Sequence, residues 1–395
     1  MKQGWEIKKL GDVCKILNGG TPDTKISQYW DGENLWITPK DMGKLNNIFV
    51  DNTSRKITDE GLKNSSAKIL PPNSIILSSR APIGHLAINI KPTSTNQGCK
   101  GLIPNQTIDT LYLYYFLSKS VELLNSLGSG TTFKELSGSK LGTVDIPVPP
   151  LPEQERIVSI LDKAFSAIEQ AKQNAEKNLK NAKELFDSYL QEAFSNGNCE
   201  KVKLSELAKD VTDGDHMPPP KSDEGFPFIT ISNINKQNRH IDFSDTFKVP
   251  KEYFDKLKEN RKPRKGDVLY TVTGSYGIPV LIEDDFEFCF QRHIGLIRPK
   301  ENVSGKWLYY WILSPDAFFQ ANDTATGTAQ KTVSLTALRS FLLPKMTLKE
   351  QQAIVQKLDT LSAETKQLEA IYQQKITELE ELKKSILQKA FNGNL

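Results

Sequence analysis

Residues of the types that carry out catalysis are scattered in this 395-residue sequence. The run Asp213–His216 looks like a metal-ligand cluster, but prolines follow it at 218–220. We interpret it as a turn rather than a metal site, because such proline-rich segments favour turns. The sequence has neither the Gly-x4-Gly-Lys-Ser/Thr loop that cradles phosphates nor a Gly-x-Gly-x-x-Gly turn after a strand. We therefore expect no catalytic residue, no metal and no cofactor in this chain.

The cysteines point to no zinc site and no disulfide framework. Cys14, Cys99, Cys199 and Cys289 are far apart in the sequence. Both kinds of site are recognised by cysteines at short, regular spacing. We interpret the four as buried or unused thiols.

The charge balance bounds the kind of partner that the chain can bind. It has 51 Lys and Arg against 48 Asp and Glu, and a net charge of +3. Any DNA-binding surface must therefore be a local patch. A hydrophobic fraction of 38% suits packed cores, and the length suits two to four domains. The sequence has no apolar run long enough for a membrane span and no signal peptide at its start, so we expect a cytoplasmic protein.

The sequence contains one long tandem repeat. Residues 130–194 align with residues 327–391 without a gap, with 21 identities in 65 positions. Upstream the similarity is weaker: Leu35–Thr38 resembles Phe228–Ile231, and Gln97 resembles Gln291. Two long copies indicate a duplicated domain rather than a solenoid, which needs several short repeats. We expect two similar modules and a target with approximate two-fold symmetry.

A long amphipathic helix is predicted after each module. Behind the proline cluster at 147–152, apolar residues recur at steps of three and four, with one extra step of four. Asn196–Asn198 is predicted to end this helix, which would span about 63 Å. In the second copy Thr365 and Lys383 are polar exceptions to the pattern. The apolar stripe, called the seam here, includes Ile157, Leu161, Ile168, Leu179, Phe186, Ile354, Leu358, Leu361, Leu368, Leu379 and Ile386.

A narrow apolar stripe on a long helix needs a partner. We expect the two helices to pair with each other in antiparallel fashion; the alternative is that each folds back on its own domain. The predicted class is α+β. Two similar α/β domains, residues 1–150 and 198–345, are separated by two long antiparallel coiled-coil helices, residues 151–197 and 346–395. The tandem duplication would give the chain a pseudo-two-fold axis.

The junctions between module and helix resemble the specificity subunit of type I restriction-modification systems. The first junction combines Gly130, Thr131, Thr132 and Lys134 with the run Ile146–Val158. The second has Gly327, Thr328 and Lys331, then Leu343, Pro344, Glu350, Gln351, Ile354 and Val355. It departs from the family pattern at residues 345–347, where Lys-Met-Thr replaces a proline cluster. The turns at Ser78–Gly84 and Gly266–Leu269 also look like that family's recognition domains, and the resemblance covers essentially the whole chain.

The resemblance implies a DNA-binding subunit without catalysis. In such proteins each recognition domain reads one half of a bipartite site, and the paired helices act as a spacer and dock two methyltransferase subunits. Restriction subunits can join them. S-adenosylmethionine, ATP and magnesium are then expected only on partner subunits. The alternatives are a two-domain coiled-coil interaction protein without DNA specificity, and a self-contained nuclease or methyltransferase, which would need a longer chain with a cofactor motif.

Polar residues on the predicted turns are candidate DNA contacts. Arginine and glutamine can form bidentate hydrogen bonds with base edges, whereas lysine and threonine more often hold phosphates. We interpret Gln97 and Gln291 as equivalent, and so as residues that support the domain or hold phosphate. The candidates are Asn18, Thr21, Thr38, Lys40, Arg80, Gln97 and Lys100 in the first domain, and Thr230, Asn233, Thr273, Ser275, Tyr276, Gln291 and Arg292 in the second.

Overall fold

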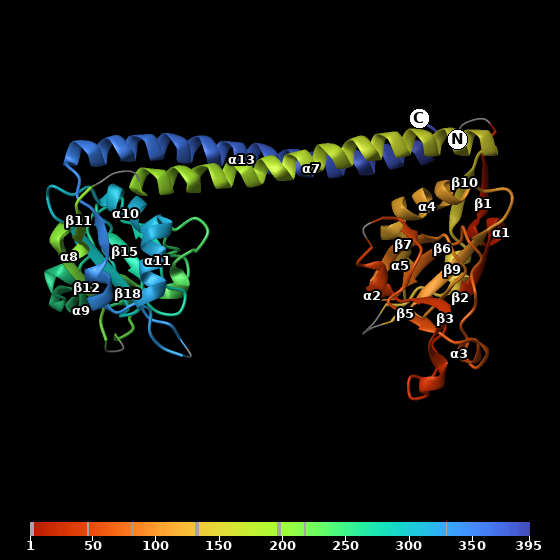
Figure 1. Cartoon of the computed structure of the whole chain (residues 1–395), viewed down its shortest axis with the longest axis horizontal. Helices are drawn as coiled ribbons and strands as arrows, with labels where there is room; N and C mark the ends of the chain where they lie inside the picture. The colour runs from red at the N-terminus through yellow and green to blue at the C-terminus, as the bar shows by residue number, and fades with distance from the viewer. Residues whose placement is uncertain are drawn as a thin grey trace. The chain divides into compact units, whose positions relative to one another are not determined.

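The computed structural model describes residues 4–45, 47–80, 82–130, 134–195, 199–216, 219–328 and 330–395. The motif residues Ala81, Thr131, Thr132 and Ala329, the proposed helix end Asn196–Asn198 and Pro218 lie outside these ranges. Contacts divide the chain into two units, residues 1–175 with 374–395, and residues 176–373. Each unit therefore contains one globular domain and a part of each long helix (Figure 1).

The first domain is built on a five-stranded sheet in the order β2-β9-β6-β7-β4 and a three-stranded sheet in the order β5-β3-β8. Strand β6 lies in the middle of the larger sheet and is buried along its whole length, as its continuous apolar and small side chains allow. The strands are β1 (Glu6–Lys9), β2 (Cys14–Asn18), β3 (Trp30–Ile37), β4 (Phe49–Val50), β5 (Arg55–Ile57), β6 (Ile75–Ser79), β7 (Ile83–Asn89), β8 (Thr93–Thr95), β9 (Cys99–Pro104) and β10 (Asp145–Val148). The helices are α1 (Leu10–Val13), α2 (Pro39–Met42), α3 (Asp59–Lys63), α4 (Thr110–Lys119), α5 (Val121–Leu127) and α6 (Gly138–Gly142).

The second domain repeats this plan. Its sheets have the orders β12-β18-β15-β16 and β14-β13-β17, so only an equivalent of the edge strand β4 is missing among the described strands. The strands are β11 (Lys201–Lys203), β12 (Ala208–Asp213), β13 (Phe226–Ile229), β14 (Phe247–Val249), β15 (Val268–Thr271), β16 (Pro279–Leu281), β17 (Cys289–Phe290), β18 (Ile294–Pro299) and β19 (Leu342–Pro344). The helices are α8 (Leu204–Leu207), α9 (Lys251–Lys256), α10 (Gly305–Leu313), α11 (Pro315–Thr324) and α12 (Leu335–Ser340). The prediction of two similar α/β domains is confirmed.

The two long helices are α7 (Leu151–Ser195) and α13 (Leu348–Phe391), and they pair antiparallel. In the first unit, Lys172 Nζ of α7 lies 2.8 Å from Glu380 Oε1 of α13, and Lys383 Nζ lies 5.0 Å from the Phe165 ring centroid. In the second unit, Tyr189 near the end of α7 shares a groove with Ile354 near the start of α13. In each unit the start of one helix therefore faces the end of the other.

The seam is buried unevenly. Ile157, Leu161, Ile168 and Leu358 are buried, whereas Leu179, Phe186, Ile354, Leu361, Leu379 and Ile386 are half-buried. Leu368 is exposed and does not fit the prediction, because a pair of helices covers only a narrow stripe of each partner. The polar exception Thr365 is buried and satisfies its hydroxyl on the Leu361 carbonyl at 2.8 Å.

The ends of the long helices also close the domain cores, which the sequence analysis did not predict. At the end of α13, the Phe391 ring packs on Tyr112 and Phe116 of α4, with centroid distances of 5.0 and 5.5 Å. At the end of α7, Phe194 packs on Trp307 of α10 at 6.0 Å. Each core thus contacts both helices, since the start of its own helix is also buried there. The run Leu-Gln-x-Ala-Phe, which occurs at residues 190–194 and again at residues 387–391, marks this contact.

A buried glutamine fixes each helix to its domain. Gln154 Oε1 accepts a hydrogen bond from the Asp109 backbone N–H at 2.8 Å, and its Nε2 donates to the Thr107 and Pro149 carbonyls at 3.0 and 2.8 Å. In the second domain Gln351 Oε1 accepts from the Ser304 N–H at 2.8 Å, and its Nε2 donates to two carbonyls in the same way. The repeated glutamine of the junction motif therefore has a structural reason.

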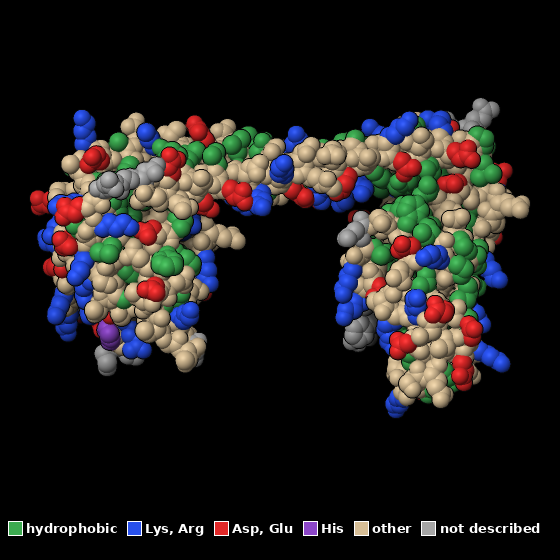
Figure 2. All heavy atoms as spheres, viewed as in Figure 1, with side chains coloured by type: hydrophobic (Ala, Val, Ile, Leu, Met, Phe, Trp, Pro, Cys, Tyr) green, Lys and Arg blue, Asp and Glu red, His purple; other side chains and the backbone are tan. Residues whose placement is uncertain are grey.

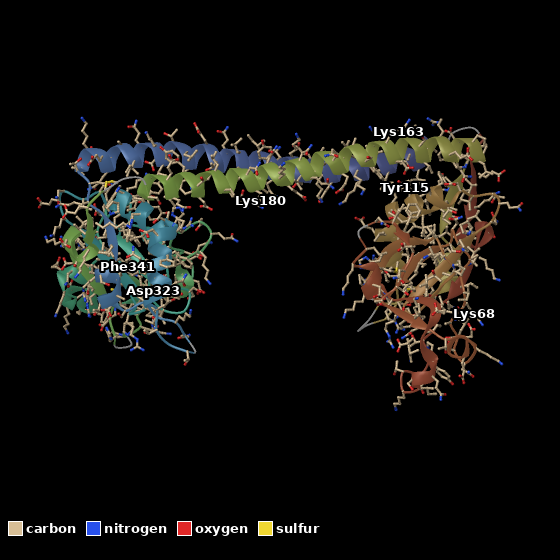
Figure 3. All side chains as sticks on the ribbon, viewed as in Figure 1. Lys68, Tyr115, Lys163, Lys180, Asp323 and Phe341 are labelled. Carbon is tan, nitrogen blue, oxygen red and sulfur yellow. The ribbon has the colours of Figure 1, made fainter. Side chains whose placement is uncertain are left out.

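A tyrosine strengthens each of these joints. The Tyr115 hydroxyl, labelled in Figure 3, donates to the Asp162 carboxylate of α7, and the Tyr310 hydroxyl donates to Asp359 of α13 at 2.6 Å. Burial is the main cause that raises the pKa of both tyrosines, and the hydrogen-bonded carboxylate raises it further. Both hydroxyls therefore stay protonated and continue to donate at neutral pH.

Replacing Gln154 with leucine should destabilise the joint. The Asp109 N–H and two carbonyls would lose their partners in a buried site, which is expected to cost about 2–4 kcal/mol in the free energy of unfolding. Gln170→Leu, at an exposed position of the same helix, is the matched control and should change stability by less than about 0.5 kcal/mol. Urea unfolding of the full chain measures both variants. Equal stabilities would contradict the role of this joint.

The four cysteines and the run Asp213–His216 form no metal-binding arrangement within the described residues. Cys14, Cys99 and Cys289 are buried, and burial raises the pKa of each thiol to about 12, while Cys199 is exposed. In the run Asp213–His216, His216 Nε2 lies 2.8 Å from Asp213 Oδ2, and Asp215 accepts a hydrogen bond from Tyr253. Within the described ranges, no group of three or more His, Cys, Asp or Glu residues could hold a metal ion. The described helices include none that is long and apolar enough to cross a membrane.

Candidate nucleic-acid interface

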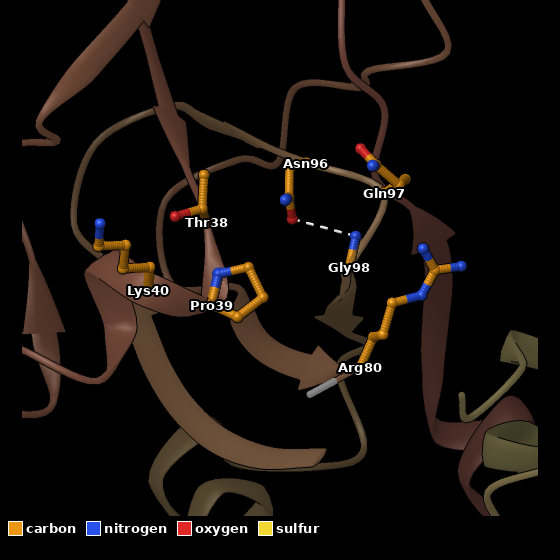
Figure 4. A pocket seen from close by; sticks show the side chains of 7 residues that line it. All are labelled: Thr38, Pro39, Lys40, Arg80, Asn96, Gln97 and Gly98. Carbon is orange, nitrogen blue, oxygen red and sulfur yellow. Dashed lines mark hydrogen bonds between the residues drawn. The ribbon is translucent and has the colours of Figure 1, made fainter. Parts of the chain in front are cut away.

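A polar pocket of about 370 Å³ opens on the first domain where three turns meet (Figure 4). The turns follow β3, β6 and β8, so the strand ends of both sheets position the side chains. Four of the predicted DNA contacts come together here. The lining residues are Thr38, Pro39, Lys40, Arg80, Asn96, Gln97 and Gly98, of which Thr38, Lys40, Arg80 and Gln97 were predicted.

Thr38 positions the first turn by capping helix α2. Its hydroxyl accepts a hydrogen bond from the Asp41 N–H at 3.3 Å and donates to Asp41 Oδ2 at 2.7 Å. Burial opposes the ionisation of Asp41, but hydrogen bonds from Ser54 and Thr38 outweigh it and lower the pKa of this carboxyl. The turn is therefore fixed by an ionised cap, and Lys40 stands exposed beside it. An exposed lysine at the start of a helix is suited to holding a phosphate.

Arg80 is held at the rim by a carboxylate. Its guanidinium donates a hydrogen bond to Glu135 Oε2, and Lys100 Nζ lies 3.8 Å from Glu135 Oε1. The Arg80 hydrogen bond is the main cause that lowers the pKa of Glu135. Burial lowers the pKa of Lys100, which is 5% exposed. Lys100 is therefore a wrong candidate for a surface phosphate contact, because its ammonium lies inside the domain against Glu135.

The remaining candidates of the first domain surround the pocket. The Thr21 hydroxyl donates to Gln97 Oε1, so Thr21 orients the Gln97 amide. Asn18 is exposed at the end of β2, in register with Lys100 on β9. The Asn96 side chain accepts from the Gly98 N–H at 3.0 Å and shapes the third turn (Figure 4).

Backbone pairing corrects the predicted equivalence of Gln97 and Gln291. The Asn96 N–H donates to the carbonyl of Ile37, the last residue of β3, at 3.0 Å. The Gln291 N–H makes the same bond, also 3.0 Å, with Ile229, the last residue of β13. Gln291 therefore corresponds to Asn96, and Arg292 corresponds to Gln97. Sequence comparison missed this because it matched Gln97 with Gln291 by residue identity, which shifts the two turns by one residue against their backbone hydrogen bonds.

The same comparison places the other turn residues. Thr230 caps the turn after β13 as Thr38 caps the turn after β3, since both lie directly behind the last residue of their strand. Thr273 and Thr332 form an antiparallel backbone bridge in the second domain, and Arg80 and Glu135 form the equivalent bridge in the first. The two domains thus present different side chains from equivalent turns. The corresponding pairs are Thr38 and Thr230, Arg80 and Thr273, Asn96 and Gln291, and Gln97 and Arg292.

Two candidates of the second domain have local partners. The Ser275 hydroxyl accepts a hydrogen bond from Lys236 Nζ at 2.7 Å, which brings an unpredicted cation to this turn. The Tyr276 hydroxyl donates to the Asn322 side-chain oxygen, and its ring stacks on Phe318 with a centroid distance of 6.4 Å. Both turn residues remain partly accessible.

Asn233 is a wrong candidate, because its side chain is buried and fully engaged. Its Oδ1 accepts from the Thr230 N–H at 2.9 Å and hydroxyl at 2.8 Å, and its Nδ2 donates to the Asp242 and Asp245 carbonyls.

In contrast to Asn233, the candidate Arg292 is exposed on the surface of the second domain. Figure 2 shows lysine and arginine side chains among carboxylates on the visible face of each domain, as expected of local basic patches rather than a wholly basic surface.

Comparison with known proteins identifies relatives. A family model described as the type I restriction modification DNA specificity domain matches residues 2–177 and 196–381. The MjaIX specificity subunit of a type I restriction enzyme from Methanocaldococcus jannaschii is 40% identical over 212 residues, which are 53% of this chain and 49% of that protein. The chain thus spans about half the length of this relative. The EcoKI specificity subunit of Escherichia coli is 23% identical over 100% of this chain and 90% of its own.

Two solved structures share the fold over the whole chain. One, from a study of complex assembly and conformational transition of the type I R-M system, has a TM-score of 0.77 at 20% identity and covers 100% of this chain and 99% of its own. The HsdS subunit of Thermoanaerobacter tengcongensis has a TM-score of 0.63 at 19% identity and covers 100% of this chain and 98% of its own.

Proposed function

Because the chain belongs to the type I restriction-modification DNA specificity family, we propose that it is the DNA-reading subunit of a type I restriction-modification complex. Each recognition domain, residues 1–150 and 198–345, reads one half of a bipartite site. The chain itself is not a catalyst. S-adenosylmethionine, ATP and magnesium act on the partner subunits.

The observation that carries this proposal is the pair of equivalent turns with different side chains. The first domain presents Arg80 and Gln97 where the second presents Thr273 and Arg292. A common scaffold with different hydrogen-bond donors and acceptors is what two different half-sites require, because base edges are distinguished by their donor and acceptor patterns. A general interaction protein gives no reason for this divergence.

The helices α7 and α13 supply the spacer and the docking surface. The glutamine joints hold each domain to its own long helix through backbone groups. In this proposal the helices leave an unread gap between the two half-sites. We assign residues 151–197 and 346–395 to this spacer and propose that it docks two methyltransferase subunits. Restriction subunits join the same complex where the system has them, and the complex works in the cytoplasm.

Selection from a pool of random DNA duplexes tests this function. The chain assembled with its methyltransferase subunits should enrich two short specified blocks on either side of an unspecified gap. The methyltransferase subunits without this chain are the control and should enrich no sequence. A single contiguous block would contradict two-domain reading, and the absence of any enriched sequence would favour an interaction protein without DNA specificity.

A further inference from the structure

Three positions that are linked by ion pairs, one of them Arg80 on the rim of the polar pocket, are charged in the first domain and neutral in the second. Arg80 and Glu135 form a backbone bridge, and Thr273 and Thr332 form the same bridge in the second domain. Lys100 lies opposite Leu77 of β6, and Gly295 lies opposite Tyr270 of the equivalent strand β15. The three positions come from sequence segments far apart and differ together, which indicates that they act as one unit. The corresponding pairs are Arg80 and Thr273, Lys100 and Gly295, and Glu135 and Thr332.

The three charged side chains Arg80, Lys100 and Glu135 compensate one another. The Lys100 side chain is 6% exposed, and a buried ammonium requires a nearby opposite charge. Glu135 provides that charge at 3.8 Å and at the same time accepts the hydrogen bond from Arg80. In the second domain the two threonine hydroxyls lie 3.4 Å apart, and no charge needs compensation there. Glu135 therefore restrains the Arg80 side chain, and the second domain has no such charged pair at Thr273 and Thr332.

The restraint leaves the guanidinium able to bind a ligand. Arginine has five N–H donors, and the Arg80 side chain is 42% exposed beside Gln97 and Asn96. Guanine offers O6 and N7 as paired acceptors in the major groove, and the planar guanidinium matches them bidentately. Holding the side chain in place before binding reduces the conformational entropy that binding would cost. The threonine at position 273 cannot make this bidentate contact.

Resting on the proposed DNA-reading function, we propose that Arg80 reads a guanine in the half-site of the first domain and that Glu135 is its positioning residue. The second domain cannot make this bidentate guanine contact from Thr273. Its exposed arginine, Arg292, stands on a different turn, where the first domain has Gln97. The guanine contact at position 80 is therefore specific to one half-site.

Methylation sequencing of cells that express the chain with its methyltransferase tests this assignment. Arg80→Gln should relax one guanine position of one half-site, with a loss of about 10- to 100-fold in discrimination. Glu135→Gln should keep the guanine but weaken the preference for it. The other half-site, read by the same molecule, is the internal control and should stay unchanged. Lys9→Gln removes a positive charge from β1, outside the pocket, and should leave both half-sites intact.

The outcomes separate this proposal from the function on which it rests. A wild-type complex that methylates no bipartite sequence would contradict the proposed function itself. A wild-type bipartite sequence with no guanine in the first domain's half-site, or an Arg80→Gln variant with an unchanged sequence, would overturn only the Arg80 assignment. If Arg80→Gln abolishes methylation, Arg80→Lys should restore it with a relaxed guanine position. Restoration of the unchanged sequence, or no restoration at all, overturns the assignment.

Discussion

Leu161→Asp is expected to destabilise the first unit by about 4 kcal/mol or more. The Leu161 side chain is fully buried in the core that α7 shares with the first domain and the end of α13. An aspartate there would place an unpaired charge among apolar side chains, which is among the most costly substitutions in a protein. Thermal denaturation of the full chain should show a melting temperature lower by about 10 °C or more. Co-purification with the methyltransferase subunits should also fail.

Leu185→Asp is the matched control, because it introduces the same charge on the same helix at a position that is 50% exposed. It should melt within a few degrees of the wild type. Leu358→Asp, fully buried at the equivalent place in the second unit, should behave like Leu161→Asp. If all three variants melted and assembled alike, the packing of the paired helices on the domain cores would be wrong.

The sequence predicted the features that local patterns encode. The seam follows from a regular three-four spacing within single helices, and the two domains follow from a constant offset between copies. Burial of the helix ends was not predictable, because Leu190 and Leu387 are covered by domain cores that are distant in the sequence. Leu368 was wrongly included, since its spacing fits the seam but only a second helix is available to cover it.

Which candidate DNA contacts lie together could be predicted only in part, and their contact with DNA stays a prediction. Turn chemistry pointed to Thr38, Arg80 and Gln97, and folding brings them to one pocket. Glu135 was missed because its partner Arg80 is 55 residues away, and no local pattern marks the pair. Lys100 was a wrong candidate because its partner, Glu135, is likewise distant in the sequence. Asn233 was wrong for a different reason, because the turn from Thr230 to Asp245 uses its whole side chain.

Exchange of a single recognition domain should change one half of the target and leave the other half intact. The glutamine joint favours such an exchange, because Gln154 binds backbone groups of Thr107, Asp109 and Pro149 rather than their side chains. The joint also has a tyrosine that donates to a helix aspartate: Tyr115 donates to Asp162 in the first domain, and Tyr310 donates to Asp359 in the second. A related domain should therefore dock if it keeps that tyrosine and the aromatic side chains that pack on Phe391, here Tyr112 and Phe116.

Independent reading by the two domains is tested by methylation sequencing of this exchange. Residues 1–150 are replaced by the corresponding domain of a relative, with residues 151–395 unchanged, and the chain is expressed with its methyltransferase. The reciprocal exchange of residues 198–345 is the control. We expect each exchange to replace a different half of the methylated sequence, with the other half and the gap retained. A single exchange that altered both halves together would contradict the account.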